Sequence, residues 1–543
     1  MVRLNAGGAL RLGLALLSVG CAGPVDKSPA SGPDTAEPVL PDDGAARLAR
    51  ASLDLRGHRP SPAELAAAAD GAEADRQIAA WLEDAALGAR VAALWAPTWG
   101  TAADQYLVAA DQFGPYEEAA LMASLGQQPT RLIQRLVEDG LPWSTFATAE
   151  WTVVDELLLD LLPVEAEDEP ARDGWVRARW TDGRPPLGAF GSPGFYLRTT
   201  STEFNAQRSR ANAISRIALC DDFLDRDVPL GTGATILDQE AAINAMRDDP
   251  GCQACHDALD PVAAHLWGFH QMFDGSPSEY LRYHAEREFF WQTWGGGVGP
   301  SFEGQPSDAA ADLGPALASS GRFSRCAASQ TRALLLLDPA AAAEAEGTDA
   351  ALAAYTDSGG DLRAVIASVL QDPAYRGVGQ ASAGGAGRRL LTGERMERAL
   401  SALVDVHFTI DGWGLSDNDR AGLRTLAGPA DLHSLAAGSP TPSPTQVLVQ
   451  GALAEAVAGL AIGPSLPGGL FEIGDLEADL DDDAWAARHA ELSLRALSRP
   501  PAPGELAADR ALYAAARAAG ASPAEAWQAV LTALLLDPAA VWG

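Results

Sequence analysis

The sequence predicts a mainly α-helical protein made of several domains. Long runs of valine and isoleucine are rare, whereas alanine, glycine and proline are abundant, which favours helices joined by turns over sheets. Two segments, Ser61–Glu64 and Ser522–Glu525, have the same pattern of serine, proline, alanine and glutamate. In such a pattern serine caps a helix, proline fits its first position and glutamate closes a capping box. A chain of 543 residues is long enough for several such domains.

The first twenty residues have the features of an export signal. Arg3 and Arg11 precede a short apolar run, Leu12–Leu17, and small residues then lead to Cys21. The run is too short to span a bilayer as a stable helix and predicts a signal peptide. The residues before Cys21 resemble a bacterial lipobox, in which the cysteine carries the lipid. We therefore expect a lipoprotein with lipid as its membrane anchor. The residue after Cys21 resembles the outer-membrane sorting pattern, so we expect the protein in the outer membrane, facing the periplasm or the cell surface.

Composition divides the rest of the chain. Residues 21–45 are rich in Pro, Asp, Ser and Gly and predict a disordered tether. Residues 46–175 predict an N-terminal helical domain, in which Thr130 is expected to cap a helix and residues 130–165 to continue in helices. Residues 176–376 form the next expected region, followed by a Gly/Ala/Ser-rich linker at 377–388. Residues 389–543 predict a C-terminal helical domain.

The charge balance excludes one class of partner. The formal net charge is −34. Such a surface repels nucleic acid and anionic lipid headgroups, so we expect no nucleic-acid partner. The acidic surface keeps the protein soluble, and it is also suited to steering a basic redox partner.

The segment Gly251–His256 contains two cysteines separated by two residues and followed directly by histidine. This is the attachment pattern of a c-type haem. The thiols of Cys252 and Cys255 would form thioethers with the haem, and His256 would be the proximal iron ligand. A helical start at this point would place the three residues on neighbouring faces of one turn.

Other interpretations of the pair are half a zinc site, a redox dithiol or chance. The chain has five cysteines and no second Cys-x-x-Cys to complete a four-sulfur zinc site. Export favours haem, because c-type haem is attached outside the cytoplasmic membrane and an exported dithiol would tend to oxidise.

Several blocks of the chain resemble the planctomycete-type cytochrome c family, including the segments that end at Cys220 and at Cys326. The segment Arg50–Leu65 is similar to its R-x-S-L-D-L-x-G segment and following helix start, and Pro142–Val154 is similar to a second block. The third block, C-x-x-C-H-x-x-I-D-P, is matched at the haem motif and at Asp260 and Pro261, although the following Gly-Phe is displaced to Gly268-Phe269. The resemblance implies an exported protein that carries one covalently attached haem c.

The same resemblance implies a disulfide between Cys220 and Cys326. Both match cysteines of the family's blocks, and they remain once Cys21 is assigned to lipid and two cysteines to haem. In an oxidising compartment two remaining cysteines are expected to pair.

The far side of the iron has several candidate ligands. Met272 and His284 are the leading ones, and Met246, His265 and His270 are the others. A further alternative is an open site, with no protein ligand on this side of the iron. We expect Asp260-Pro261 to turn the chain just past His256, with a nearby backbone carbonyl accepting the imidazole N–H. The aromatic residues expected either to wall the haem or to pack in an ordinary core are Trp267, Phe269, Trp291 and Trp294.

Three functional hypotheses follow from these residues. The leading one is a lipid-anchored c-type cytochrome that transfers electrons to an unidentified redox partner. The second is a haem peroxidase or a small-molecule or redox sensor with an open distal site. The third is a haem-free helical scaffold in which Cys252 and Cys255 form a disulfide. We see no Ser/His/Asp hydrolase pattern and no phosphate-binding glycine loop.

Overall fold

The structure is a computed structural model, and it describes residues 2–3, 44–99, 113–168, 173–199, 201, 205–226, 248–271, 277–294, 296–337, 339–376, 390–410, 413–414, 443–462 and 480–541. These residues are mainly helical, as the sequence predicts. The predicted Cys21, Met246 and Met272 lie outside the described residues, as do the linker at 377–388 and nearly all of the signal peptide and tether.

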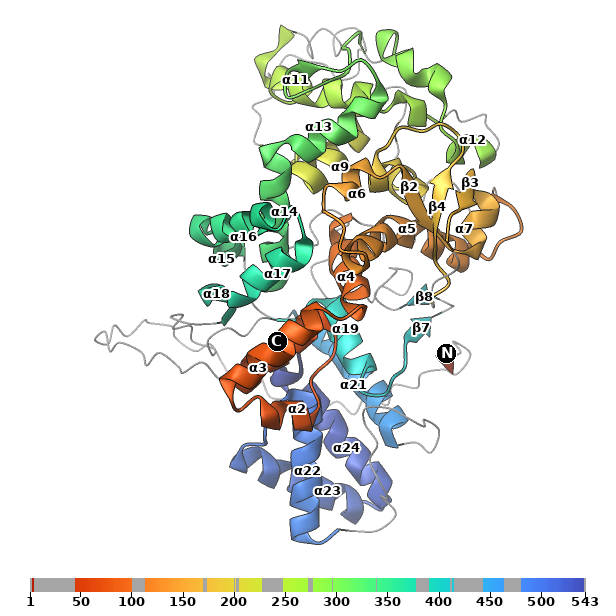
Figure 1. Cartoon of the computed structure of the whole chain (residues 1–543). Coiled ribbons are helices and arrows are strands. Elements are labelled where there is room, and N and C mark those ends of the chain that lie inside the picture. Colours follow the sequence, from red (N-terminus) through yellow and green to blue (C-terminus); the bar gives the residue numbers. More distant parts are fainter. Residues whose placement is uncertain are drawn as a thin grey trace.

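The helices of the larger part of the molecule run from α1 to α18 (Figure 1). They are α1 Gly44–Leu55, α2 Pro62–Ala67, α3 Gly71–Leu82, α4 Ala86–Trp99, α5 Glu118–Glu138, α6 Thr145–Thr148, α7 Glu156–Leu161, α8 Pro193–Tyr196, α9 Arg208–Leu219, α11 Pro250–Ala264, α12 Pro277–Leu281, α13 Leu313–Ser319, α14 Gly321–Leu336, α15 Pro339–Ala342, α16 Ala345–Asp357, α17 Leu362–Gln371 and α18 Pro373–Arg376. Short 3₁₀ helices are η2 Gly188–Gly191, η3 Trp267–Phe269, η4 Ala285–Gln292 and η5 Ala310–Asp312.

The remaining helices are α19 Gly393–Ser401, α21 Pro444–Ile462, α22 Asp482–Leu497, α23 Pro503–Ala518, α24 Pro523–Leu536 and η6 Pro538–Val541. The strands form three small sheets. In the first, β2 Trp151–Val154 and β3 Val164–Ala166 both pair antiparallel with β4 Val176–Trp180. The second is a hairpin of β5 Ser301–Phe302 and β6 Gln305–Pro306. The third joins β1 Val2–Arg3, β7 Phe408–Ile410 and β8 Trp413–Gly414.

Helix starts agree with the sequence in some places and differ in others. Ser61 and Ser522 both cap their helices within complete capping boxes, which confirms the two predicted starts. The helix expected to start at Thr130 instead begins at Glu118, and it continues through Pro129 as α5. Residues 151–154 form a buried strand, so the expected run of helices over 130–165 is also wrong.

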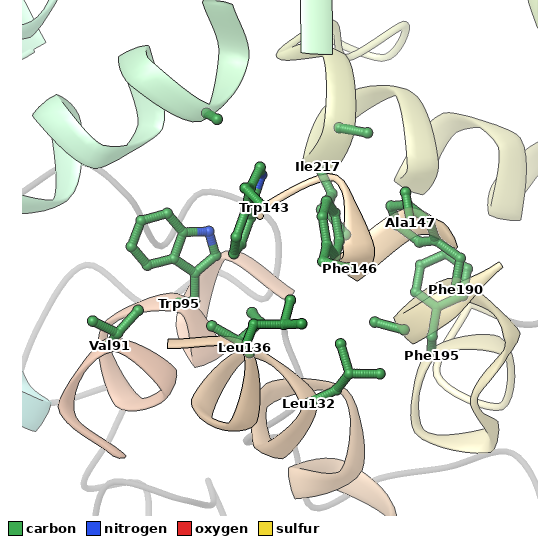
Figure 2. Close-up of a cluster of buried hydrophobic side chains, with 14 of the residues drawn as sticks. Val91, Trp95, Leu132, Leu136, Trp143, Phe146, Ala147, Phe190, Phe195 and Ile217 are labelled. Atoms are coloured by element: carbon green, nitrogen blue, oxygen red, sulfur yellow. The ribbon is translucent and has the colours of Figure 1, made fainter. Parts of the chain in front are cut away.

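One hydrophobic core extends through the larger part of the molecule, from Leu48 to Tyr375. It therefore crosses residue 176, where a domain boundary was expected. At its centre Trp143 stacks on Phe146, and Phe146 packs against Phe190 (Figure 2). Trp143, Phe146 and Trp151 are buried, which confirms that they are core residues.

A second core is built almost entirely from residues 390–541. Figure 1 shows its helices α22–α24 at one end of the molecule and α11 at the other. Helix α21 is long and apolar enough to cross a membrane, the one such helix among the described residues. Its Val449, Leu453 and Val457 are buried in this second core, and a core helix meets the same criterion of length and composition.

A buried polar cluster joins the two cores. Asp54 of α1 accepts hydrogen bonds from Arg395 of α19 and from the hydroxyl of Tyr375, the latter at 2.8 Å. Arg395 also donates to the carbonyl of Leu334 in the last turn of α14, where helix carbonyls lack intrahelical donors. Arg50 stacks over the ring of Tyr375 at 3.9 Å and donates to that residue's carbonyl oxygen. Arg50 and Asp54, both in the segment Arg50–Leu65, therefore take part in the contact between the two cores.

Candidate haem site

The Cys-x-x-Cys-His residues lie in the first two turns of α11. Asp249 caps this helix, because its carboxylate accepts hydrogen bonds from the backbone N–H groups of Gly251 (2.7 Å) and Cys252 (3.4 Å). Cys252, Cys255 and His256 are therefore three and four residues apart on a regular helix, where such side chains are neighbours. The helical start predicted for this motif is confirmed.

His256 is held by the carboxylate of Asp260, one turn further along α11. Its Nδ1 lies 3.0 Å from Oδ1 and 3.1 Å from Oδ2 of Asp260. A sequence-based expectation was therefore wrong: the carboxylate, not a backbone carbonyl, accepts the imidazole N–H. When Nδ1 carries the proton, Nε2 has a free lone pair. Nε2 makes no hydrogen bond to any residue that the structure describes, and the side chain is 23% exposed.

Arg208, at the start of α9, completes this arrangement. Its Nε donates to Oδ1 of Asp260 at 2.5 Å and its Nη2 donates to Oδ2 at 2.9 Å. Burial disfavours the ionised carboxylate, but the hydrogen bonds from His256 and Arg208 outweigh it and lower the pKa of Asp260. Asp260 is therefore a carboxylate with both oxygens engaged, and it fixes the orientation of the His256 ring.

The backbone turn before α9 places Arg208. Ala206 and Gln207 have φ values of 52° and 68°, in the left-handed region that costs energy for residues other than glycine. Gln207 is fully buried and bonded at both ends: its N–H donates to the Ser201 hydroxyl (2.7 Å), and its amide nitrogen lies 2.8 Å from Nδ1 of His270. These contacts hold the strained turn in place.

No pattern in the sequence pointed to a role for Arg208. Its position was recognised as part of a segment leading into a helix, but its partner Asp260 lies 52 residues away. No spacing rule connects two residues at that separation on different helices. The contact becomes visible only once α9 is packed against α11.

The helix continues beyond the point where the sequence predicted a turn. Pro261 lies inside α11, which ends at Ala264. The expected turn after Asp260 is therefore absent. A proline inside a helix has no N–H for the carbonyl four residues earlier, here that of Asp257, yet α11 continues for three more residues.

The described histidines that follow have other partners. His265 is buried, and its Nδ1 lies 3.0 Å from the carbonyl oxygen of Pro261. His270 is also buried and contacts Gln207. Burial and the charges of Arg210 and Arg287 lower the pKa of His270 to about 4.

His284, a leading candidate for the far side of the iron, has both ring nitrogens engaged. Nδ1 lies 3.1 Å from a carboxylate oxygen of Glu286, and Nε2 lies 3.0 Å from the backbone carbonyl of Glu279. This arrangement offers an iron atom no free ring nitrogen. The other leading candidate, Met272, lies outside the described residues.

Two of the four aromatic residues expected to line a haem pocket lie beside Arg208 and Asp260. Trp267 and Trp291 surround the same small depression as Arg208 and Asp260. Trp267 is fully buried, whereas Trp291 is partly exposed. Phe269 packs in the large core, and Trp294 is 53% exposed.

The four cysteines that the structure describes separate into a bonded pair and two free thiols. Cys220, at the end of α9, and Cys326, in α14, have their sulfur atoms 2.15 Å apart and their Cα atoms 5.3 Å apart, which is disulfide geometry. Cys252 and Cys255 are both free. Burial, with the nearby Asp249 and Cys255, raises the pKa of Cys252 and keeps it a thiol.

Two free thiols and an oriented imidazole with an available Nε2 fit the attachment chemistry of haem c. No group of three His, Cys, Asp or Glu side chains that could hold a metal ion by itself occurs in the part of the chain that the structure describes. Comparisons with protein-family models, curated proteins and solved structures found no match. The resemblance to planctomycete-type cytochrome c therefore stays a prediction from the motifs quoted above.

Proposed function

We propose that the chain is an exported, lipid-anchored c-type cytochrome-like protein that binds one haem and transfers electrons. The observation that supports this most is the set Cys252, Cys255 and His256 on one stretch of α11, with the ring of His256 oriented by Asp260. In His256 a carboxylate is bonded to Nδ1 and Nε2 is left free, and a histidine with a purely structural role does not require this combination. A metal-binding histidine has that arrangement.

Each residue has a defined role in this proposal. Cys252 and Cys255 hold the haem covalently, and His256 binds its iron through Nε2. Asp260 orients the ring of His256, and the guanidinium of Arg208 donates to the same carboxylate and balances its negative charge. Haem c would supply a one-electron Fe(III)/Fe(II) couple. Cys21 would carry the lipid that keeps the protein at the membrane.

Mass spectrometry of the intact chain tests haem attachment. The full chain is exported in a host that has c-type haem maturation, together with the double variant Cys252→Ala/Cys255→Ala and the control Cys220→Ala/Cys326→Ala. We expect the wild type and the control to gain the mass of one haem, and the double variant Cys252→Ala/Cys255→Ala to gain none. An unmodified wild-type chain with a Cys252–Cys255 disulfide would refute the proposal and favour the helical scaffold.

A second candidate function is a haem-based peroxidase or sensor with an open distal site. It is favoured by the fact that both ring nitrogens of His284 have partners, and that Nδ1 of His270 also has one. Carbon monoxide binding to the reduced native protein distinguishes the two. Binding by wild type supports an open site, whereas binding by Met272→Ala alone supports Met272 as the sixth ligand of an electron carrier.

A further inference from the structure

A cavity of about 200 Å³ lies between α9, α11 and the turn of the β5–β6 hairpin. Its walls are mainly apolar. The apolar residues that line it include Ile214, Leu219, Leu259, Val262, Phe302 and Leu317. An apolar cavity of about 150 Å³ accommodates benzene, so this one has room for a single ring with a short substituent.

The cavity wall contains hydrogen-bond acceptors at Asp257 and Ser215. The exposed carboxylate of Asp257 has no hydrogen bond or ion pair to any described residue. Pro261, in the same wall, has no N–H to donate to the Asp257 carbonyl. Ser215 is buried, and its hydroxyl, which can also accept, makes no hydrogen bond within the described chain.

The one cation among the described wall residues already has carboxylate partners. Arg322 lies 2.7 Å from a carboxylate oxygen of Asp221 and 3.6 Å from one of Glu303. Among the described residues that line the cavity, the two carboxylates of Asp257 and Glu303 outnumber the one guanidinium of Arg322. An anionic ligand would meet net repulsion there, whereas a ligand with an ammonium group would be attracted to Asp257.

We propose that this cavity binds a small, mostly apolar primary amine, with its ring or alkyl body between α9 and α11 and its ammonium group at Asp257. The apolar wall accounts for the body of the ligand, and the unpartnered acceptors account for its charged end. This site is distinct from the Cys252–His256 residues, and the proposal does not depend on haem being bound.

The test compares three probes of similar shape: benzylamine, benzyl alcohol and benzoate. Binding to the full chain is followed by ligand-observed NMR and by titration calorimetry. We expect benzylamine to bind with a Kd on the order of 1 mM, more tightly than benzyl alcohol, and benzoate to bind least. Asp257→Asn should weaken benzylamine about three- to fivefold, as for a partly exposed ion pair, and leave benzyl alcohol unchanged.

Two further variants locate the site. Ala258→Phe places a ring in the cavity from an exposed wall position and should abolish binding of both benzylamine and benzyl alcohol. The control Asp357→Asn makes the same charge change on an exposed position of α16 and should leave binding unchanged. Absence of benzylamine binding, equal binding of benzoate, or full binding by Asp257→Asn and Ala258→Phe would each overturn the proposal.

Discussion

Replacing Asp260 by asparagine tests directly the ion pair with Arg208 that holds the carboxylate bonded to His256. The side chains of Arg208 and Asp260 are 16% and 10% exposed, and two hydrogen bonds join them. Removing one partner of a buried ion pair costs ~3–5 kcal/mol, and an exposed pair contributes ~0–1 kcal/mol. Asparagine keeps an oxygen that accepts from His256 but turns an N–H group toward the guanidinium. We therefore expect a loss of about 2–3 kcal/mol in the local stability of α9 and α11.

Hydrogen exchange followed by mass spectrometry measures this loss locally, which matters because a chain with two cores does not unfold in one step. A loss of about 2–3 kcal/mol corresponds to roughly 30- to 150-fold faster exchange in peptides from α9 and α11. The matched control is Asp349→Asn, which breaks the exposed pair of Arg325 and Asp349 (54% and 61% exposed). Its effect should stay under about fivefold. Asp260→Asn exchange within threefold of wild type would refute the proposed role of this ion pair.

Three further predictions follow from the structure. Folding lowers the pKa of Asp260, so the stability that its carboxylate contributes is complete above the unfolded pKa of about 4 and is lost as pH falls through the lower pKa of the folded state. The hydrogen-exchange rates of α9 and α11 in wild type and in Asp260→Asn should therefore become equal in acid. Reducing the Cys220–Cys326 pair, which is separated by 106 residues, should lower the free energy of unfolding of the larger part of the chain by about 4–5 kcal/mol on the chain-entropy model, as measured by urea titration with and without reductant. Equal midpoints would contradict that pairing. Asp54→Asn should leave Arg395 partly unpaired and destabilise the junction by about 3 kcal/mol, seen as early tryptic cleavage between the two cores; wild-type cleavage rates would argue against the junction.

Local signals in the sequence predicted local structure well. The capping boxes at Ser61 and Ser522 depend on residues three apart, and both form as expected. The helical start at the haem motif depends on Asp249 and the following turn, which are equally local. Thr130 shows the limit of such signals, because the packing of α5 against α4 carries that helix through Pro129 and overrides the serine-like capping preference of threonine.

Contacts between distant residues could not be predicted in the same way. Arg50 and Asp54 were recognised as part of a family-like segment, but their partners Tyr375 and Arg395 follow more than 300 residues later. Arg208 was missed for the same reason. These charged side chains are buried only because α-helices from separate parts of the chain meet, and a pattern read along one helix contains no information about the other.

The measurement that tests the central proposal most directly is the visible absorption spectrum of the intact chain, made with c-type haem maturation and reduced with dithionite. The proposal predicts the sharp α and β bands of a haem attached through two thioethers, and it predicts that His256→Ala disturbs them while Asp349→Asn does not. A spectrum with no haem bands in the wild-type protein would contradict the assignment of Cys252, Cys255 and His256 as a haem site.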